Sequence, residues 1–364
     1  MKPRGVVMSG GGTGGHLFPA LAVARALRGI DPGLPVVFAG SRRPLEAGLL
    51  AGTGFDFVPL AIEGLKRRGW KSLRTLALLP VALAQALALL ARTRPRLVVG
   101  AGGYSSGPVV LPAALLGVPT LLLEPNVRPG FTNRLLRPWV RAAAVAFPDS
   151  LPAFKGKGVV LGNPVRAAFE TIGPPPAGGP FTVLVFGGSQ GSAFLNEAFG
   201  AALPLLAARK ADLRVVHQTG ARDLARVRER YRAQGFGAVE AAAFFADMPE
   251  RFARAHLVVC RAGATTCAEL VAAGRAAVLV PFAAAAEGHQ LHNARALEKA
   301  GGAVVLEEKD CAPEALAAAI LRLAADRAAL ASMEAKLAAL RRPGAAGRIA
   351  RLCLDLMGRP GGKD

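Results

Sequence analysis

Residues 1–20 have the sequence MKPRGVVMSGGGTGGHLFPA. The apolar residues 5–9 are followed by the glycine-rich residues 10–15, then by His16, and residues 20–27 have a helical pattern. Glycine permits a tight turn between a strand and a helix, and it lets backbone N–H groups at the helix N-terminus approach a phosphate. The stretch therefore predicts a strand, a phosphate-binding loop and a helix, which together open an α/β domain.

The same pattern starts again in the second half of the chain. Residues 181–186, FTVLVF, predict a strand, residues 187–192, GGSQGS, a second glycine loop, and residues 193–206 a helix. Further strands are predicted at residues 34–39, 96–100, 119–123, 140–146, 158–161, 213–218, 238–243, 257–260, 276–281 and 303–306. Strands that alternate with helices predict an α/β fold of two Rossmann-like domains, each with a doubly wound parallel sheet. Ligands of such sheets bind beyond the carboxyl ends of the strands, so we expect the domains to face a shared cleft.

The domain boundaries follow from composition. Residues 162–180, GNPVRAAFETIGPPPAGGP, are rich in proline and glycine and predict a hinge between domains at 1–161 and 181–343. The last helical stretch, residues 313–357, is interrupted at Pro343 and Gly344. We expect its final part, residues 344–358, to pack back on the first domain.

Charge and cysteine content narrow the class of protein. The 364 residues carry a formal net charge of +20, which predicts attraction to polyanions such as nucleic acids, acidic membranes or phosphorylated substrates. Only 6% of residues are aromatic, which disfavours a protein that stacks single-stranded nucleic acid. The four cysteines have no CxxC spacing, so we expect buried thiols rather than disulfides or a zinc site.

The first glycine loop also fits a dinucleotide fingerprint, because Gly10, Gly12 and Gly15 have GxGxxG spacing. A dinucleotide site would need an acidic residue at the end of the second strand, where this chain has Arg42 and Arg43. Paired arginines suit a 2′-phosphate, so an NADP-dependent oxidoreductase remains an alternative. Two phosphate-type loops, one in each domain, favour two separate phosphorylated partners.

Three features of the hinge and the second domain favour a nucleotide sugar. Glu269 follows a small-residue segment after a predicted strand, where a helical carboxylate can reach ribose hydroxyls. Arg166 at the hinge can supply a cation for a diphosphate, since the chain has no Asp-x-Asp motif for a metal. His289 and His292 lie three residues apart, but no cysteine or aspartate accompanies them, so hydrogen bonding to a sugar is favoured over metal binding.

Seven motifs occur in order over nearly the whole chain: GGTGGHLFPA, GGYSSGP, EPNVRPGFTNRLL, GNPVR, GGSQGS, CRAGATTCAE and HQLHNA. Together they resemble the MurG family of glycosyltransferases. The resemblance implies the two-domain GT-B fold, UDP-N-acetylglucosamine as sugar donor and undecaprenyl-diphospho-muramoylpentapeptide as acceptor. It implies transfer to the muramic acid 4-hydroxyl with inversion, with no cofactor and no metal. A non-hydrolysing UDP-sugar epimerase shares this architecture and is a second alternative.

The resemblance assigns residues to a sugar-donor site, mainly in the second domain. Glu269 would bind the ribose, Ser189 and Gln190 the diphosphate, and the Phe245 backbone the uracil. The matching positions are Thr13, Gly14, Gly15, Asn126, Arg166, Ser189, Gln190, Asn196, Phe245, Ala264, Thr265, Thr266, Glu269, His289 and Gln290.

The first domain would bind the acceptor. The matching positions are Thr13, Gly14, Gly15, His16, Gly103, Tyr104, Ser105, Ser106 and Asn133, and the catalytic candidates are His16, Tyr104, Glu124 and Asn126. Inversion in one displacement requires a base that takes the proton of the attacking hydroxyl. His16 suits this role because histidine titrates near neutral pH, and Glu124 is the rival base.

A lipid-linked acceptor implies a peripheral protein at the cytoplasmic face of the plasma membrane. The segment KRRGWKSLR, residues 66–74, precedes the uncharged residues 75–91. Pro80 and Gln85 interrupt that run, so we expect no spanning helix. Either a buried crossover helix or an interfacial patch fits the pattern. The patch would contact an anionic membrane through Lys66, Arg67, Arg68, Trp70, Lys71 and Arg74.

Overall fold

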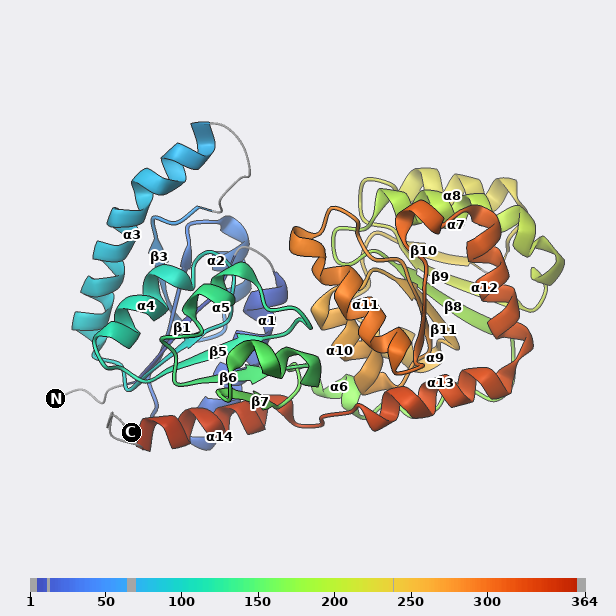
Figure 1. Cartoon of the computed structure of the whole chain (residues 1–364). Coiled ribbons are helices and arrows are strands. Elements are labelled where there is room, and N and C mark those ends of the chain that lie inside the picture. The colour runs from blue at the N-terminus through green and yellow to red at the C-terminus, as the bar shows by residue number, and fades with distance from the viewer. Residues whose placement is uncertain (1–4, 12–13, 64–69, 238, 359–364) are drawn as a thin grey trace. The chain divides into compact units, whose positions relative to one another are not determined.

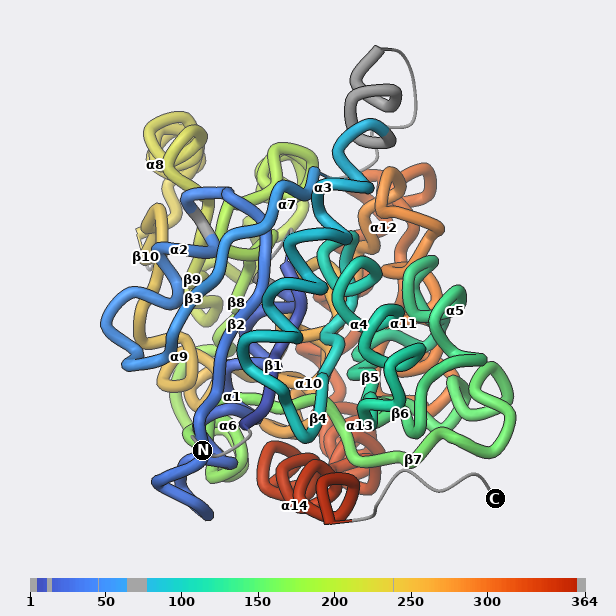
Figure 2. The backbone as a smooth tube through the Cα atoms, turned by 90° about the vertical axis from the view of Figure 1, so that its left-hand side faces the viewer, coloured from blue at the N-terminus to red at the C-terminus, as the bar shows by residue number. Residues whose placement is uncertain are grey.

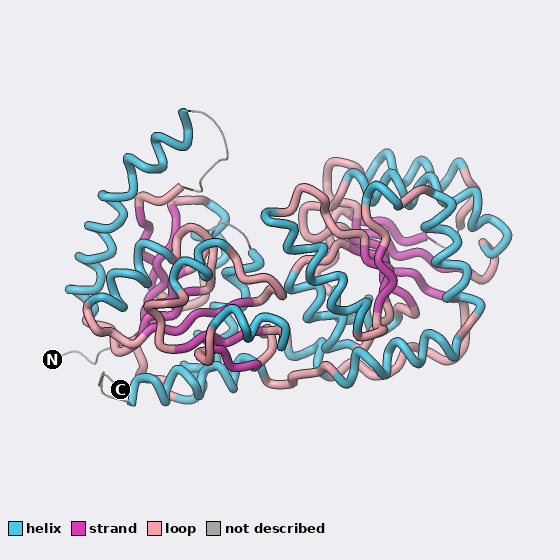
Figure 3. The backbone as a smooth tube through the Cα atoms, viewed as in Figure 1, coloured by secondary structure: helices cyan, strands magenta, loops and turns pink. Residues whose placement is uncertain are grey.

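The computed structural model describes residues 5–11, 14–63, 70–237 and 239–358 (Figure 1). The chain divides into two compact units. Unit 1 comprises residues 1–165 and 344–364, and unit 2 comprises residues 166–343. Residues 166–180, which the sequence analysis places in the hinge, therefore belong to unit 2. Each unit has its own parallel sheet with helices on both faces, as Figure 3 shows.

The described part of unit 1 contains a seven-stranded parallel sheet in the order β3-β2-β1-β4-β5-β6-β7. Figure 2 follows these strands from blue β1 to green β7. The strands are β1 Val6–Ser9, β2 Val36–Ser41, β3 Asp56–Leu60, β4 Leu97–Gly100, β5 Thr120–Glu124, β6 Ala142–Val145 and β7 Gly158–Val160. The strand order reverses between β1 and β4, so a crevice opens at their carboxyl ends, where the segments containing Gly10 and Gly102 begin.

Helices cover both faces of this sheet. They are α1 Gly14–Ile30, α2 Pro44–Leu50, α3 Trp70–Thr93, α4 Gly107–Leu115, α5 Phe131–Leu136 and α14 Ala345–Gly358, with the 3-10 helix η1 Pro148–Phe154. Side chains alternate along a strand, so Val6 and Met8 pack in the cluster with α1 and α14, and Val7 packs with α3 and α4. The C-terminal helix α14 therefore completes the core of unit 1.

The described part of unit 2 contains a six-stranded parallel sheet in the order β10-β9-β8-β11-β12-β13. The strands are β8 Phe181–Phe186, β9 Leu213–Gln218, β10 Val239–Ala242, β11 Leu257–Cys260, β12 Ala277–Leu279 and β13 Ala303–Val305. The helices are α6 Ala167–Glu170, α7 Ala193–Leu206, α8 Leu224–Ala233, α9 Met248–Arg254, α10 Ala264–Ala273, α11 His289–Lys299, α12 Pro313–Ala325 and α13 Arg327–Ala339, with the 3-10 helices η2 Ala207–Arg209, η3 Ala286–Gly288 and η4 Glu308–Asp310. Here the order reverses between β8 and β11, which places a second crevice at the loops after those strands.

Two elements differ from the sequence-based expectation. The strand β3 was not identified, because Pro59 and Asp56 are unusual strand residues; β3 is an edge strand, where proline costs no ladder hydrogen bond. The final helical stretch breaks once more than expected, at Asp326. The Asp326 side chain accepts a hydrogen bond from the Ala329 N–H at 2.8 Å and so caps the start of α13.

Candidate active site

In unit 2, the glycine loop after β8 packs against the loop after β9. Gly191 has φ +74° and Gly220 has φ +80°, and a Cβ at either position would collide with the backbone of the other loop. Ser192 caps α7 by accepting from the Leu195 N–H at 3.3 Å, while Ser189 and Gln190 are exposed. Exposed polar side chains beside a helix N-terminus are suited to bind a phosphate group.

Glu269 lies in the second turn of α10, which follows β11. Strand β11 pairs with β8, so α10 and the glycine loop after β8 follow neighbouring strands. Burial raises the pKa of the Glu269 carboxyl to about 7, and the positive charge of Arg166 acts in the opposite direction. The Arg166 guanidinium donates to the Ala246 carbonyl at 3.2 Å and lies over the Phe169 ring at 5.1 Å. The Glu269 carboxylate is therefore poorly stabilised without a ligand, and hydroxyl donors would stabilise it.

The first turn of α10 carries small and polar residues. Gly263 precedes it without a side-chain cap, and Ala264, Thr265 and Thr266 are half-buried. The hydroxyl oxygen of Thr265 is buried and has no hydrogen-bond partner among the described residues. Together with the uncapped N–H groups, this hydroxyl makes the start of α10 a second place where a polar ligand can bind.

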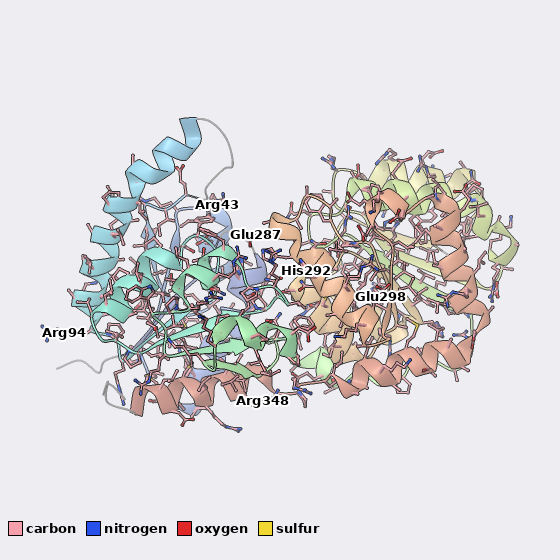
Figure 4. All side chains as sticks on the ribbon, viewed as in Figure 1. Arg43, Arg94, Glu287, His292, Glu298 and Arg348 are labelled. Carbon is pink, nitrogen blue, oxygen red and sulfur yellow. The ribbon has the colours of Figure 1, made fainter. Side chains whose placement is uncertain are left out.

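Gln290 in α11 joins two loops of unit 2. Its Oε1 accepts from the Ala262 N–H at 3.2 Å and from the Phe282 N–H at 2.9 Å. His289 lies beside Glu287, with 3.6 Å between Nε2 and Oε2, and Figure 4 labels Glu287 and His292 at the start of α11. Within the described ranges, no group of three or more His, Cys, Asp or Glu side chains could hold a metal ion. The Gln290 side-chain oxygen thus joins the two loops, while its expected contact with the sugar stays a prediction for the amide Nε2.

Asn196 belongs to a buried network under the loop after β9. Its Nδ2 donates to the Thr219 carbonyl and to Asp223 Oδ2, both at 2.9 Å, and its Oδ1 accepts from His217 Nε2 at 3.0 Å. Tyr231 Oη donates to His217 Nδ1 at 2.8 Å, and burial lowers the pKa of His217 to about 3. Both N–H groups of Asn196 are thus used inside unit 2, where this residue holds the loop after β9 in place; its expected ligand contact stays a prediction.

The Phe245 side chain is buried beneath the Arg251 guanidinium, which lies 4.5 Å from the ring centroid. The Phe245 backbone N–H donates to Gln218 Oε1 at 2.8 Å. A contact between the Phe245 backbone and a base would therefore use the carbonyl oxygen in this arrangement.

In unit 1, His16 lies in the first turn of α1, against the loop after β4. Its Nδ1 is 2.9 Å from the Ala101 carbonyl oxygen, so Nδ1 carries the proton in the neutral ring and Nε2 is the basic nitrogen. Gly103 has φ +74°, and a Cβ there would collide with the Gly11 carbonyl, so the two glycine segments are in close contact. His16 therefore lies beside the glycine segment after β1 and the glycine segment after β4.

Glu124 ends β5 and is 2% exposed. Its carboxylate accepts from the Asn126 and Gly130 N–H groups, both at 3.0 Å, and from the side-chain amides of Asn126 at 3.1 Å and Asn133 at 2.9 Å. Burial raises the pKa of Glu124, while these hydrogen bonds lower it. A carboxylate with four protein donors holds the loop after β5 in shape, so the geometry favours His16 over Glu124 as the base.

Of the remaining acceptor candidates, Ser105, Ser106 and Asn133 are buried and Tyr104 is half-buried. Ser106 Oγ donates to the Ser9 carbonyl at 2.8 Å, so this hydroxyl joins β1 to the loop after β4. Asn133 donates from Nδ2 to the Leu123 carbonyl at 3.0 Å, and its buried Oδ1 has no partner among the described residues. Tyr104 is half-buried, with its hydroxyl 3.5 Å from Ser41 Oγ.

Comparison with known proteins identifies the family of the chain. The glycosyltransferase family 28 N-terminal domain matches residues 6–145, and the family 28 C-terminal domain matches residues 182–349. The chain belongs to glycosyltransferase family 28. Two curated relatives are named UDP-N-acetylglucosamine–N-acetylmuramyl-(pentapeptide) pyrophosphoryl-undecaprenol N-acetylglucosamine transferase. The one from Syntrophotalea carbinolica is 44% identical over 97% of this chain and 99% of its own, and that from an Anaeromyxobacter species is 46% identical over 99% and 96%.

A solved structure extends the family 28 comparison to the fold. The crystal structure of Acinetobacter baumannii MurG has a TM-score of 0.80 with 30% sequence identity, and covers 97% of this chain and 100% of its own. The expected resemblance and the GT-B class are thereby confirmed. The oxidoreductase and epimerase alternatives are not favoured.

Two residues that organise the family 28 site were not among the candidates. Arg261 is buried after β11, and it donates to Ser192 Oγ at 3.0 Å and to the Val280 carbonyl at 3.1 Å, and pairs with Glu308 at 2.6 Å. Glu46 is buried and accepts from the Ser41 N–H at 2.7 Å and the Ser41 hydroxyl at 2.6 Å. Arg261 lies within the motif CRAGATTCAE, so its charge beside a glycine loop was a usable signal.

Glu46 also bears on the dinucleotide alternative. Its carboxylate packs on Gly11 and Gly40, where a Cβ would collide with it. Arg43, which was considered for a 2′-phosphate, lies over the Tyr104 ring at 5.5 Å. Although this carboxylate lies at the end of β2, both its oxygens accept hydrogen bonds from Ser41, so they are engaged within unit 1 and do not point to a ribose contact.

The remaining predicted positions lie at the start of α1 or outside the described residues. Gly14 and Gly15 begin α1. Thr13, Lys66, Arg67 and Arg68 lie outside the described residues, as do the side chains of Trp70, Lys71 and Arg74.

The raised pKa of Glu269 predicts a pH dependence of nucleoside binding. Ribose hydroxyls donate to the carboxylate form, so uridine should bind best above pH 7 and more weakly as the pH falls through about 7, by up to about tenfold per pH unit. Calorimetric titration with uridine between pH 5.5 and 8.5 measures this, and Glu269→Gln should flatten the profile. An equally steep profile in the Glu269→Gln variant would show that another group titrates.

Proposed function

We propose that this chain transfers N-acetylglucosamine from UDP-N-acetylglucosamine to the 4-hydroxyl of the muramic acid of undecaprenyl-diphospho-muramoylpentapeptide, with inversion. Family 28 membership over both halves and the names of the full-length relatives support this reaction. The observation that carries the proposal is the crevice of unit 2, where exposed Ser189 and Gln190 lie at the start of α7 and Glu269 lies on α10. That combination suits a ribose joined to a diphosphate.

In this site the sugar donor is bound without a resident cofactor. The N-termini of α7 and α10 and the guanidinium of Arg166 supply positive potential for the diphosphate, which is the leaving group. The chain has no Asp-x-Asp motif that would hold a metal-bound diphosphate. Transfer should therefore persist in the presence of EDTA.

In unit 1 the acceptor diphosphate binds at the glycine segments around Gly15 and Gly103. His16 accepts the proton of the attacking hydroxyl on Nε2, because Nδ1–H is donated to the Ala101 carbonyl. Attack of that oxygen on the anomeric carbon breaks the bond to UDP, so one displacement inverts the configuration. Glu124 acts indirectly, through the loop that carries Asn126.

The proposed base role predicts a selective loss of turnover. His16→Ala should lower kcat about 10²-fold or more with little change in the affinity for UDP-N-acetylglucosamine, since it removes proton transfer only. Steady-state assays with a soluble analogue of the lipid acceptor, with EDTA present, measure both quantities. Gln234→Ala, at an exposed glutamine of unit 2 that is not a site candidate, is the control. An unchanged kcat would remove His16 from the role, and absence of transfer by the wild-type protein would contradict the proposed reaction.

A lipid-linked acceptor requires contact with a bilayer, which we place on unit 1. No helix within the described ranges has the length and apolarity needed to span a membrane. Helices α3, α4 and α5 lie next to one another on one face of the sheet (Figure 1). These helices and the residues that directly follow α4 and α5 expose large apolar side chains, namely Leu79, Val81, Leu87, Leu115, Leu116, Phe131, Leu135 and Trp139. Apolar groups on a protein of charge +20 suit the interface of an anionic bilayer.

This surface predicts the effect of two variants on membrane binding. Replacing Leu115 and Leu116, which are 64% and 62% exposed, by Ser should weaken binding to anionic vesicles about tenfold, because it removes apolar area from the interface. Replacing Lys66, Arg67, Arg68 and Lys71 by Glu should weaken it further at low salt. Co-sedimentation with phosphatidylglycerol vesicles gives the affinities. Leu205→Ser, at an exposed leucine of unit 2, is the control, and equal binding by all variants would place the contact elsewhere.

A further inference from the structure

Gln218 is a buried polar residue that the proposed reaction does not use. It ends β9 at the carboxyl edge of the unit 2 sheet and is 2% exposed. Its Nε2 donates to the Gly188 carbonyl at 2.9 Å, and its Oε1 accepts from the Phe245 N–H at 2.8 Å. One side chain therefore joins the glycine loop after β8 to the loop after β10.

The backbone around Gln218 is itself held in place. The Thr219 N–H donates to the Ala242 carbonyl at 2.9 Å, and the Thr219 carbonyl accepts from Asn196. Gly220 lies directly against the backbone of Gln190 and Gly191. Because Gln218 extends from this fixed point, it can set the distance between the two loops.

The contact to Gly188 acts on a part of the glycine loop where the backbone has a positive φ. Gly188 has φ +97°, a backbone conformation that favours glycine. Because glycine has no side chain, it can also adopt other backbone conformations. A hydrogen bond to its carbonyl oxygen selects one of these conformations. The peptide of Gly188 and Ser189 is the part of the loop next to the proposed diphosphate contacts.

We propose that Gln218 is a positioning residue that couples recognition of the base to recognition of the diphosphate. The inference rests on the proposed sugar-donor site, in which the Phe245 loop contacts the base and the Gly188 loop the diphosphate. A buried amide is costly unless both its ends are hydrogen-bonded, and here each end bonds to a different loop. Gln218 thus holds both loops in the arrangement that one UDP group requires.

Two substitutions separate the two hydrogen bonds. Gln218→Met has a similar shape and removes both bonds, so the affinities for uridine and for UDP should each fall at least fivefold. Gln218→Glu keeps an acceptor for the Phe245 N–H but turns an oxygen toward the Gly188 carbonyl. Its ionised form should lower the affinity for UDP at least tenfold while uridine binding changes less than threefold.

The Glu variant also offers a rescue that a purely structural role would not show. When protonated, its carboxyl can donate to the Gly188 carbonyl as the amide does. The ratio of UDP to uridine affinity, relative to that of the wild-type protein at the same pH, should therefore recover as the pH is lowered from 8.5 to 5.5. Titration of Glu269 affects both ligands equally, since both carry the ribose, and cancels in this ratio.

Calorimetric titration of the full chain with uridine and UDP supplies all these affinities, and Gln234→Met, at an exposed glutamine of unit 2, is the control. If the wild-type protein binds neither ligand, the proposed function fails. If the wild-type protein binds both and the two Gln218 variants bind within twofold of it at every pH, the coupling role is wrong. Should Gln218→Met fail to fold, the pH course of the Gln218→Glu ratio decides alone, and a flat ratio overturns the inference.

Discussion

The site depends on one constraint, which is the contact of backbone against backbone at the carboxyl ends of the central strands. In unit 2, Gly191 and Gly220 bring the loops after β8 and β9 together, and in unit 1 Gly103 lies against the Gly11 carbonyl. A single Cβ at any of these points would separate the loops. Glycine is required there because any side chain would keep the loops apart. Without side chains, backbone N–H groups and helix N-termini can converge on a phosphate.

Loops built from glycine need support from elsewhere, and buried polar side chains provide it. Glu124 accepts three hydrogen bonds from the loop after β5 and a fourth from Asn133 in α5, and Arg261 binds Ser192, Val280 and Glu308. Each group is expensive to bury unless it is paired, so pairing selects a single loop shape. Much of the polar chemistry near the crevices therefore holds the backbone in shape, and exposed or half-buried residues such as Ser189 and Glu269 are left for ligands.

The sequence predicted the architecture well for a physical reason. The strands β8 and β11 are continuous runs of mainly apolar residues, as expected of parallel strands buried on both faces, and their predicted bounds agree with the structure. The edge strand β3 contains Pro59 and lacks that pattern. The part of the site that escaped prediction consists of side chains that reach across loops distant in sequence. Glu46 reaches Gly11, and Gln218 joins Gly188 to Phe245, contacts that no spacing encodes.

The central claim is that unit 2 binds a uridine diphosphate sugar and that the glycine loop of unit 1 is not a dinucleotide site. Thermal unfolding with UDP-N-acetylglucosamine, UDP and NADP⁺ in parallel tests it most directly. A ligand present at a hundred times its Kd stabilises the folded state by about 2.7 kcal/mol, which raises Tm by several degrees. We predict such a rise with both uridine ligands and none with NADP⁺. A rise with NADP⁺ alone would contradict the account.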